Sequence, residues 1–373
     1  MYNTKYRKWI STILAFCMSI MTGCTSRTFY LSLKDHISKE AAVVYDWEVS
    51  QIKFDNKARI DSMVFARKNL HSFLILKNDK LQYEWYAKGF TQKTLCNLKS
   101  ASKSIVSLLA GIAIENGKLQ IGTDLKKIFG SSVRTDSLTE KVTIEQLLTM
   151  KGGFPYIGIG YYRIVCSSLN PTKSIIERRK AVSPDDSAVY SDISVNLLGY
   201  AVSQAVDRKL EEFARKELFL PLGIHSDTWV KDLRGNNATA GDIFLCPRDL
   251  ARIGYLMLHK GKIGNQRIIS EQWVENSTTP KTDIAQLPSD LRYGFLWWID
   301  KNKDCRAFCA IGSGGQILYI SPLDNAVVVM TSSLKPNNWH SGLQMIREAL
   351  KEVEPNQQDA RAEKKKNKEQ INL

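Results

Sequence analysis

The stretch Ser100-Ala-Ser-Lys-Ser-Ile-Val-Ser-Leu-Leu-Ala-Gly-Ile-Ala-Ile-Glu-Asn116 carries the strongest structural signal in this chain. Its apolar residues recur at helical spacing, and apolar residues also occupy the other helix faces, which predicts a buried helix. The helix should end at Asn116-Gly117, because glycine readily adopts the left-handed conformation that closes a helix.

The first four residues of this stretch are suited to nucleophilic catalysis without a histidine. Ser100 and Lys103 lie three positions apart, so they share one helix face. At the start of the helix Ser100 would lie at the positive end of the dipole, beside free N–H groups that can hold an oxyanion. Burial favours the neutral form of a lysine, so we expect Lys103 to accept the serine proton. The alternative role for Ser100 is a plain helix N-cap.

Other hydrolase signals are absent from the sequence. It contains no GxSxG, HExxH or P-loop motif, and its five histidines follow no catalytic pattern. Ser332-Ser-Leu-Lys335 also has the SxxK pattern, but it lies at the end of a predicted strand. A serine–lysine mechanism at Ser100 is therefore the leading interpretation.

The order of the expected elements indicates an α+β fold. A capping box at Thr143-Ile-Glu-Gln146 and a proline at Pro247 mark two helix starts. The other expected elements are helices over 57–70, 194–220 and 339–352, a hairpin over 72–76 and 81–86, and strands over 293–300, 306–311, 315–320 and 326–332. We therefore expect an antiparallel β-sheet flanked by helices plus a mostly helical subdomain.

The chain begins with features of a secretory signal. A positive region at Lys5, Arg7 and Lys8 precedes the apolar stretch 9–21, which is too short to span a bilayer. Met21-Thr-Gly-Cys24 resembles a bacterial lipobox, so we expect a lipoprotein signal peptide over 1–23 and acyl chains on Cys24 that tether the protein to a membrane. An ordinary signal peptide cleaved nearby is the alternative.

We expect three further regions along the chain. Residues 24–52 should form a tether, and residues 53–353 a hydrolase domain with a helical insertion over about 118–250. The tail over 354–373 is polar and carries charges of both signs, which predicts a flexible segment.

The composition is that of a globular protein and gives no indication of nucleic-acid or metal binding. The chain has 373 residues, of which 43% are hydrophobic and 24% are charged, as in a globular protein. Its formal charge is +14, but the basic residues are scattered and no nucleic-acid-binding motif is present, so we expect no nucleic-acid partner. The seven cysteines include no CxxC pair, so we predict no metal site. Cys305 and Cys309 could pair, although buried free thiols are the simpler interpretation.

Several segments, in the right order, resemble the serine β-lactamase and penicillin-binding protein superfamily, whose nucleophile motif is SxxK. The similarity is closer to the class C β-lactamase-related branch of esterases, D-aminopeptidases and 6-aminohexanoate-dimer hydrolases. It covers about residues 57–350. Besides Ser100–Lys103, the segments that carry it are Val142–Met150 with Gly152-Gly153, Tyr190-Ser-Asp192 with Asn196-Leu-Leu-Gly199, Pro247–Gly254, Ile268–Trp273, Tyr293–Trp298 and Ile311–Gln316.

The resemblance implies a role for each matching residue. Ser100 would be the acylated nucleophile, and Lys103 and Tyr190 would share the general base and acid work. A tyrosine beside a charged lysine can be stabilised as phenolate. The N–H groups of Ser100 and Ser313 would form the oxyanion hole. The residues expected to contact substrate are Tyr156, Asp192, Gly312 and Gly314. The resemblance implies no metal and no cofactor.

The sequence departs from the family pattern in two places. Ala310-Ile-Gly312 stands where the third family motif often begins with Lys or His, which argues against β-lactam substrates and favours esters or simple amides. Asp192 replaces an asparagine, and an ionised Asp can only accept hydrogen bonds. Asp192 could pair with Lys103 and hold it charged, leaving Tyr190 as the base, or it could mark a catalytically weak member.

We therefore expect a lipid-anchored serine hydrolase of the cell envelope that acts on a small ester or amide. The alternative is a catalytically inert binding protein that keeps the fold. The sequence does not define an oligomeric state.

Overall fold

The computed structural model describes residues 30–50, 54–130, 137–158, 174, 187–225, 227–284, 290–303 and 306–353. Its centre is a seven-stranded antiparallel sheet in the order β3-β2-β13-β12-β11-β10-β9. The early hairpin and the late strands meet in this sheet, because β2 pairs with β13. The strands are β2 (Leu70–Lys77), β3 (Lys80–Tyr86), β9 (Leu291–Tyr293), β10 (Trp298–Asp300), β11 (Ala307–Gly312), β12 (Gln316–Ser321) and β13 (Ala326–Ser332).

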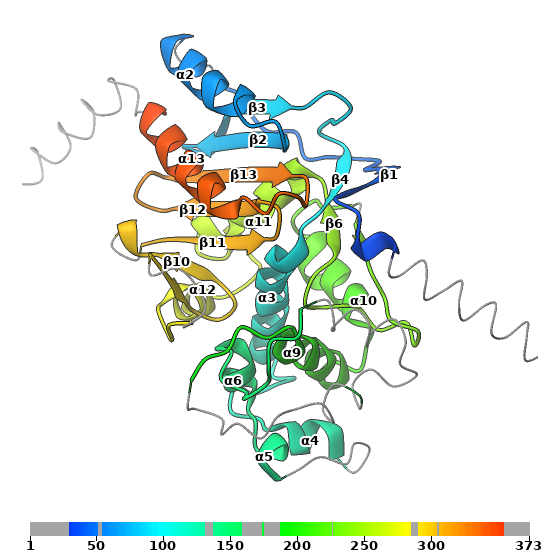
Figure 1. Cartoon of the computed structure of the whole chain (residues 1–373). Helices are drawn as coiled ribbons and strands as arrows, with labels where there is room; N and C mark the ends of the chain where they lie inside the picture. Colours follow the sequence, from blue (N-terminus) through cyan, green and yellow to red (C-terminus); the bar gives the residue numbers. More distant parts are fainter. Residues whose placement is uncertain are drawn as a thin grey trace, which may run out of the picture.

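Helices cover both faces of this sheet (Figure 1). On one face, a Cβ on Gly254 of α11 would lie 2.4 Å from Val327. On the other, a Cβ on Gly342 of α13 would lie 2.4 Å from Met330. Val327 and Met330 point to opposite faces of β13, so the two helices sandwich the sheet, with α2 beside α13. These helices are α2 (Phe54–Phe65), α11 (Pro247–Leu258) and α13 (Trp339–Glu352).

A smaller antiparallel sheet has the order β1-β4-β6-β5, and a separate hairpin joins β7 to β8. β4 ends at Asn97, shortly before Ser100, so this sheet delivers the chain to the predicted nucleophile. The strands are β1 (His36–Glu40), β4 (Thr94–Asn97), β5 (Thr228–Trp229), β6 (Ile243–Leu245), β7 (Lys262–Ile263) and β8 (Gln266–Arg267).

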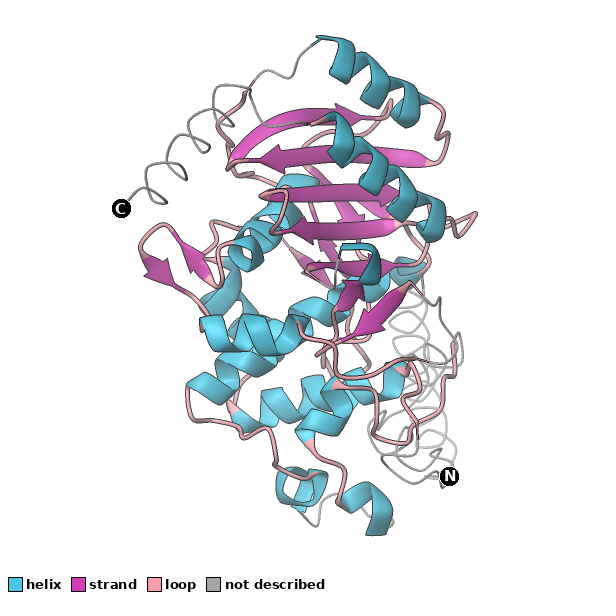
Figure 2. Cartoon of the chain, turned by 90° about the vertical axis from the view of Figure 1, so that its left-hand side faces the viewer, coloured by secondary structure: helices cyan, strands magenta, loops and turns pink. Residues whose placement is uncertain are grey.

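The helix expected from Ser100 is present and buried. A tight turn, η1 (Lys99–Ala101), leads into α3 (Ser102–Glu115), which runs from the sheets into the helical part of the molecule (Figure 1). Figure 2 shows the strands gathered in one part of the molecule and a mostly helical part beside them. There it packs against α9. The remaining helices and turns are α4 (Leu125–Phe129), α5 (Ser137–Glu140), α6 (Ile144–Leu148), α9 (Asp192–Ala205), α10 (Leu210–Ala214), η3 (Arg215–Phe219), α12 (Glu271–Thr278) and η4 (Lys301–Lys303).

Several local predictions are confirmed. The α+β class is correct, as are the 72–76/81–86 hairpin and the helix starts at Pro247 and Thr143. The capping box is complete: the Thr143 hydroxyl accepts from the Gln146 N–H, and the Gln146 side chain accepts from the Thr143 N–H. The closing helix has the expected bounds, 339–352.

The expectation of one long helix over 194–220 is wrong. α9 ends after Ala205, where Asp207 has a φ of +49° and the Arg208 N–H donates to the Ser203 carbonyl. Lys209 is then extended before α10, which continues into the wider turns of η3. Apolar residues recur through this break, so the periodicity alone did not reveal it.

Two other boundaries also need correction. The strand expected over 293–300 is a hairpin of β9 and β10, closed by a turn in which the Gly294 N–H donates to the Trp297 carbonyl and Leu296 has a φ of +61°. The helix expected over 57–70 is α2, which ends at Phe65. Its final turn leads into β2, with the Leu70 N–H donating to the Arg67 carbonyl.

Residues 30–50, the described part of the expected tether, pack against the domain. β1 pairs with β4, and the Ala41 and Trp47 side chains are buried. The predicted signal peptide, Cys24, Cys305 and the tail over 354–373 lie outside the described residues. Within the described part, no helix has the length and apolar character needed to cross a membrane. Cys309 is buried with a free thiol.

Candidate active site

Ser100 lies in the turn that begins the buried helix. Its Oγ accepts a hydrogen bond from Lys103 Nζ at 3.1 Å. Lys103 is only 1% exposed and lies one helical turn further along, so the SxxK spacing places both side chains together as expected. The arrangement gives Ser100 a cationic neighbour at the atom that would attack a substrate.

Lys103 has further partners that hold its charge. Its Nζ lies 2.7 Å from Asp192 Oδ1 and donates to the Ala240 carbonyl. Burial alone would lower the pKa of Lys103, but the Asp192 carboxylate and Tyr190 outweigh it and raise the pKa above its ordinary value. The expectation that burial makes Lys103 neutral is therefore wrong. The pairing of Asp192 with Lys103, one of the two alternatives for Asp192, is what the structure contains.

Tyr190 completes the cluster from the segment that precedes α9. The ring lies 5.1 Å from Lys103 Nζ and stacks on Trp298 with centroids 5.7 Å apart. Burial raises the pKa of the Tyr190 phenol, and Asp192 adds to this effect. The Lys103 cation and hydrogen bonds with Ser100 and Lys103 oppose it without cancelling it. The neutral phenol is therefore the resting form, and the expected stabilisation of a phenolate by Lys103 does not prevail.

Backbone contacts fix the position of Tyr190. The Val189 N–H donates to the Met150 carbonyl at 3.1 Å, and the Ser191 hydroxyl donates to the Pro155 carbonyl at 3.0 Å. The segment after α6 and the segment before α9 thus hold each other, which keeps the Tyr190 ring beside Lys103.

The predicted oxyanion hole lies between the Ser100 turn and the end of β11. A Cβ on Gly312 would lie 2.2 Å from the Leu98 carbonyl, so glycine allows β11 to approach the turn closely. Among the described residues, neither the Ser100 N–H nor the Ser313 N–H has a hydrogen-bond acceptor. Both amides are therefore free to bind a substrate oxygen.

A cavity of about 390 Å³ opens beside these groups. Four of the expected residues besides Ser100 line it: Tyr156, Tyr190, Gly312 and Ser313. Four lining residues were not predicted: Trp298, Ile311, Asn337 and Trp339. No described lining residue is charged. The cavity therefore offers an aromatic, uncharged surface around a polar centre.

Two residues that were expected to contact substrate, Asp192 and Gly314, do not line the cavity. Asp192 contacts Lys103 instead. The Gly314 N–H donates to Asn337 Oδ1 at 2.8 Å, and Gly314 has a φ of +88°. Gly314 therefore shapes the turn after β11 and positions the Asn337 side chain.

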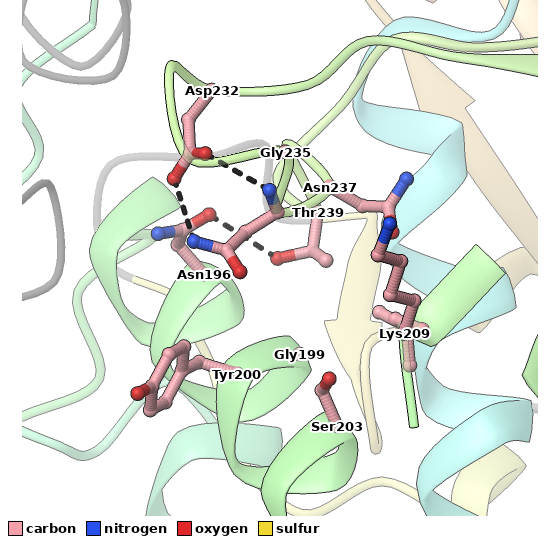
Figure 3. A pocket seen from close by; sticks show the side chains of 11 residues that line it. Asn196, Gly199, Tyr200, Ser203, Lys209, Asp232, Gly235, Asn237 and Thr239 are labelled. Carbon is pink, nitrogen blue, oxygen red and sulfur yellow. Dashed lines mark hydrogen bonds between the residues drawn. The ribbon is translucent and has the colours of Figure 1, made fainter. Parts of the chain in front are cut away.

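A second, much smaller pocket lies beside α9 (Figure 3). Its volume is about 40 Å³, and Asp232 closes a turn there by accepting from the N–H and the side-chain amide of Asn236. A Cβ on Gly199 would lie 2.3 Å from Thr239 Cγ2, so this glycine allows α9 to pack closely. The Asn196–Gly199 segment thus serves packing rather than the site at Ser100. Among the described residues, no cluster of metal-ligating side chains occurs.

Comparisons with known proteins show which family and which solved structures this chain resembles. The β-lactamase family model matches residues 66–351. The 6-aminohexanoate-dimer hydrolase of Paenarthrobacter ureafaciens is 23% identical over an alignment of 300 residues that covers 73% of this chain and 75% of that protein. A solved Bacillus anthracis structure assigned as a 6-aminohexanoate-dimer hydrolase is 18% identical, covers 85% of this chain and 91% of its own, and has a TM-score of 0.72. A class C β-lactamase is 16% identical, with coverages of 81% and 97% and a TM-score of 0.65.

Proposed function

Because this chain belongs to the β-lactamase family, whose related members are hydrolases, we propose that it is a serine hydrolase that forms an acyl-enzyme on Ser100. The observation that carries this proposal is the Ser100 Oγ to Lys103 Nζ contact of 3.1 Å at a cavity, with two free amides beside it. A nucleophile, a proton-transfer partner and oxyanion donors are the parts that acyl transfer requires.

The proposed reaction has two halves. After the Lys103–Tyr190 pair has lost one proton to solvent, Ser100 Oγ attacks the substrate carbonyl carbon and passes its own proton to the pair, while the carbonyl oxygen binds the two amides. The pair then returns the proton to the leaving-group oxygen or nitrogen, which departs and leaves the acyl group on Ser100. Water then attacks the acyl carbon and gives a proton to the same pair; the bond to Ser100 Oγ breaks, and the pair returns the proton to Ser100 Oγ as the acid leaves.

The cavity favours an uncharged ester over an amide or a carboxylate-bearing substrate. The described lining residues include aromatic rings and Ile311 but no cation that could bind a substrate carboxylate. Ala310, at the position where the family motif often has Lys or His, is 2% exposed. An ester also loses its leaving group with less protonation than an amide does, which suits a site whose acid and base groups are held at raised pKa values.

A catalytically inert binding protein is the second candidate, and one observation favours it. The Asp192–Lys103 contact of 2.7 Å keeps Lys103 protonated, so the resting site lacks a free base at neutral pH. In that case the aromatic cavity would bind a ligand without turning it over.

Reaction with a fluorophosphonate probe distinguishes these candidates, because the probe forms a bond only with an activated serine. We expect one adduct on the native chain by intact mass and none on Ser100→Ala. Ser332→Ala, which removes the serine of the other SxxK segment, is the matched control and should label normally. A folded native chain that gains no adduct would favour the binding protein.

We also propose that the protein is anchored in the cell envelope through acyl chains on Cys24. The support is the sequence of residues 1–24, in which a basic region and an apolar stretch end at Met21-Thr-Gly-Cys24. Detergent phase partitioning of the chain expressed in bacteria tests this. The native chain should enter the detergent phase, whereas Cys24→Ser should not.

A further inference from the structure

A buried ion pair lies immediately before the nucleophile. Lys99 has a φ of +49°, a left-handed conformation that is uncommon for a residue with a side chain. Its Nζ lies 2.8 Å from Asp242 Oδ1 and also donates to the Ser32 carbonyl. The Asp242 side chain is completely buried. These contacts hold an unfavourable backbone conformation at the residue that sets the direction of Ser100.

Asn97 joins the same cluster from the end of β4. Its side-chain amide donates to Asp242 Oδ1 at 2.9 Å, and its Oδ1 accepts from the Lys99 N–H at 2.9 Å. One carboxylate oxygen therefore binds both the side chain of Lys99 and the residue that holds the Lys99 backbone. Removing the Asp242 charge should loosen both at once.

The segment around Asp242 also holds the chain on the other side of Ser100. The Ala240 carbonyl accepts from Lys103 Nζ, and the Ile243 N–H donates to Ser102 Oγ at 3.2 Å. The Leu98 N–H donates to the Ile243 carbonyl at 2.9 Å. Residues 240–243 thus form hydrogen bonds with the chain on both sides of Ser100 and fix the turn that carries it.

The amino-terminal segment of the described chain completes this cluster. Besides the Ser32 carbonyl, the Lys34 carbonyl accepts from the Asn97 amide at 3.0 Å, and the Asp35 carbonyl accepts from the Asn97 N–H at 2.7 Å. Backbone oxygens at 32–35 therefore bind the two residues that lead into Ser100. The segment that follows the proposed anchor is in this way attached to the active site.

We propose that Lys99 and Asp242 are positioning residues that connect the segment 32–35 to the nucleophile turn and hold Ser100 in its reactive direction. The catalytic part of this inference rests on the proposed function; the structural part does not. A small displacement of a reacting group lowers turnover by about 100-fold. Since neither side chain touches the cavity, the effect should fall on kcat and not on KM.

The test compares Lys99→Met with Arg347→Met in the full chain. Arg347 is a matched control, because its Nε lies 2.8 Å from Asp300 Oδ2 in another buried ion pair on α13 and β10. Hydrogen exchange and ester hydrolysis are measured for both. Lys99→Met should speed exchange in 97–103 and in 32–35 together and lower kcat by about 100-fold with KM nearly unchanged. Arg347→Met should lower Tm without either effect.

The outcomes separate the two proposals. Unchanged exchange in 97–103 and 32–35 would overturn the positioning role, whatever the activity. Faster exchange with unchanged kcat would overturn its catalytic part. If the native chain proves inactive, the proposed function fails, and the exchange data still decide the connection between the two segments. Asp242→Asn keeps the size of the side chain and serves where Lys99→Met does not fold; it should give the same pattern in exchange.

Discussion

Replacing Asp192 with asparagine should make the site more active at neutral pH. The carboxylate lies 2.7 Å from Lys103 Nζ, and it raises the pKa values of both Lys103 and Tyr190. A group with a raised pKa reaches its basic form only at higher pH, so kcat/KM of the native enzyme should rise as the pH increases above neutrality. Asp192→Asn removes this influence and keeps an oxygen that can accept from Lys103.

The distance sets the size of the effect. At 2.7 Å, two unit charges attract by about 1.5 kcal/mol at the dielectric constant of water and by about 6 kcal/mol at an effective value near 20. Both side chains are largely buried, with exposed fractions of 1% for Lys103 and 13% for Asp192. The attraction calculated with the dielectric constant of water is therefore a lower bound. About 1.4 kcal/mol corresponds to tenfold in the population of the basic form, so kcat/KM near pH 7 should rise at least about tenfold.

The assay is hydrolysis of p-nitrophenyl esters by the native chain and Asp192→Asn over pH 6 to about 10. The rising limb of the profile should move to lower pH in the variant, and the two curves should converge at high pH. Asp61→Asn removes a carboxylate paired with Lys57, away from the site, and should leave the profile unchanged. A variant whose profile coincides with the native one, or whose activity falls at every pH, would refute the reasoning.

Three further predictions concern the site and the sheet. Gly312→Ala should cut fluorophosphonate labelling by more than tenfold, because its Cβ would lie 2.2 Å from the Leu98 carbonyl. Trp339→Ala should lower kcat/KM for an aromatic ester by about two- to tenfold and for an acetate ester less, since aromatic contacts contribute about 0.5–1.5 kcal/mol. Burial lowers the pKa of His71 to about 4, so the unfolded chain binds a proton first as the pH falls. Stability should drop by about 3 kcal/mol between pH 6.5 and 4, and urea unfolding of His71→Gln should show a smaller drop.

Local sequence was sufficient to predict the buried helix and the contact between Ser100 and Lys103. The apolar spacing after Ser100 and the three-residue separation from Lys103 are properties of one helical segment, so periodicity alone places both side chains on a common face. Likewise, the capping box at Thr143 and the proline at Pro247 act within a single turn of helix. Local patterns of this kind predict the structure correctly because they do not depend on contacts with distant residues.

The charge states in the site could not be read from the same segment. Burial of Lys103 was foreseeable from the apolar helix, and burial alone lowers the pKa of a lysine. The sign reversed because Asp192, from the start of another helix, lies 2.7 Å away. Sequence reasoning named this pairing as one alternative, but only the fold brings the two helices together.

Three residues that line the cavity, Trp298, Asn337 and Trp339, were not predicted from local sequence. Trp339 begins the closing helix and Asn337 precedes it, so nothing nearby distinguishes them from surface residues. Trp298 begins β10 and stacks on Tyr190 only because β9 and β10 form a hairpin where a single strand was expected. These residues become site residues through the pairing of the late strands with each other and with β2.

In the proposed mechanism, position 192 determines which group can act as the base. With Asp192 present, Lys103 is a cation that donates to Ser100 Oγ, so it stabilises a serine oxygen that has already lost its proton. The Ser100 proton must then pass to Tyr190, which can accept it only as phenolate. Because the neutral phenol is the resting form, this active form is populated only at higher pH. With asparagine at this position, Lys103 loses the anion that holds its charge and can take the proton itself. The two forms therefore share a nucleophile and an oxyanion site but differ in the path of the proton, and the pH dependence of Asp192→Asn reports that path directly.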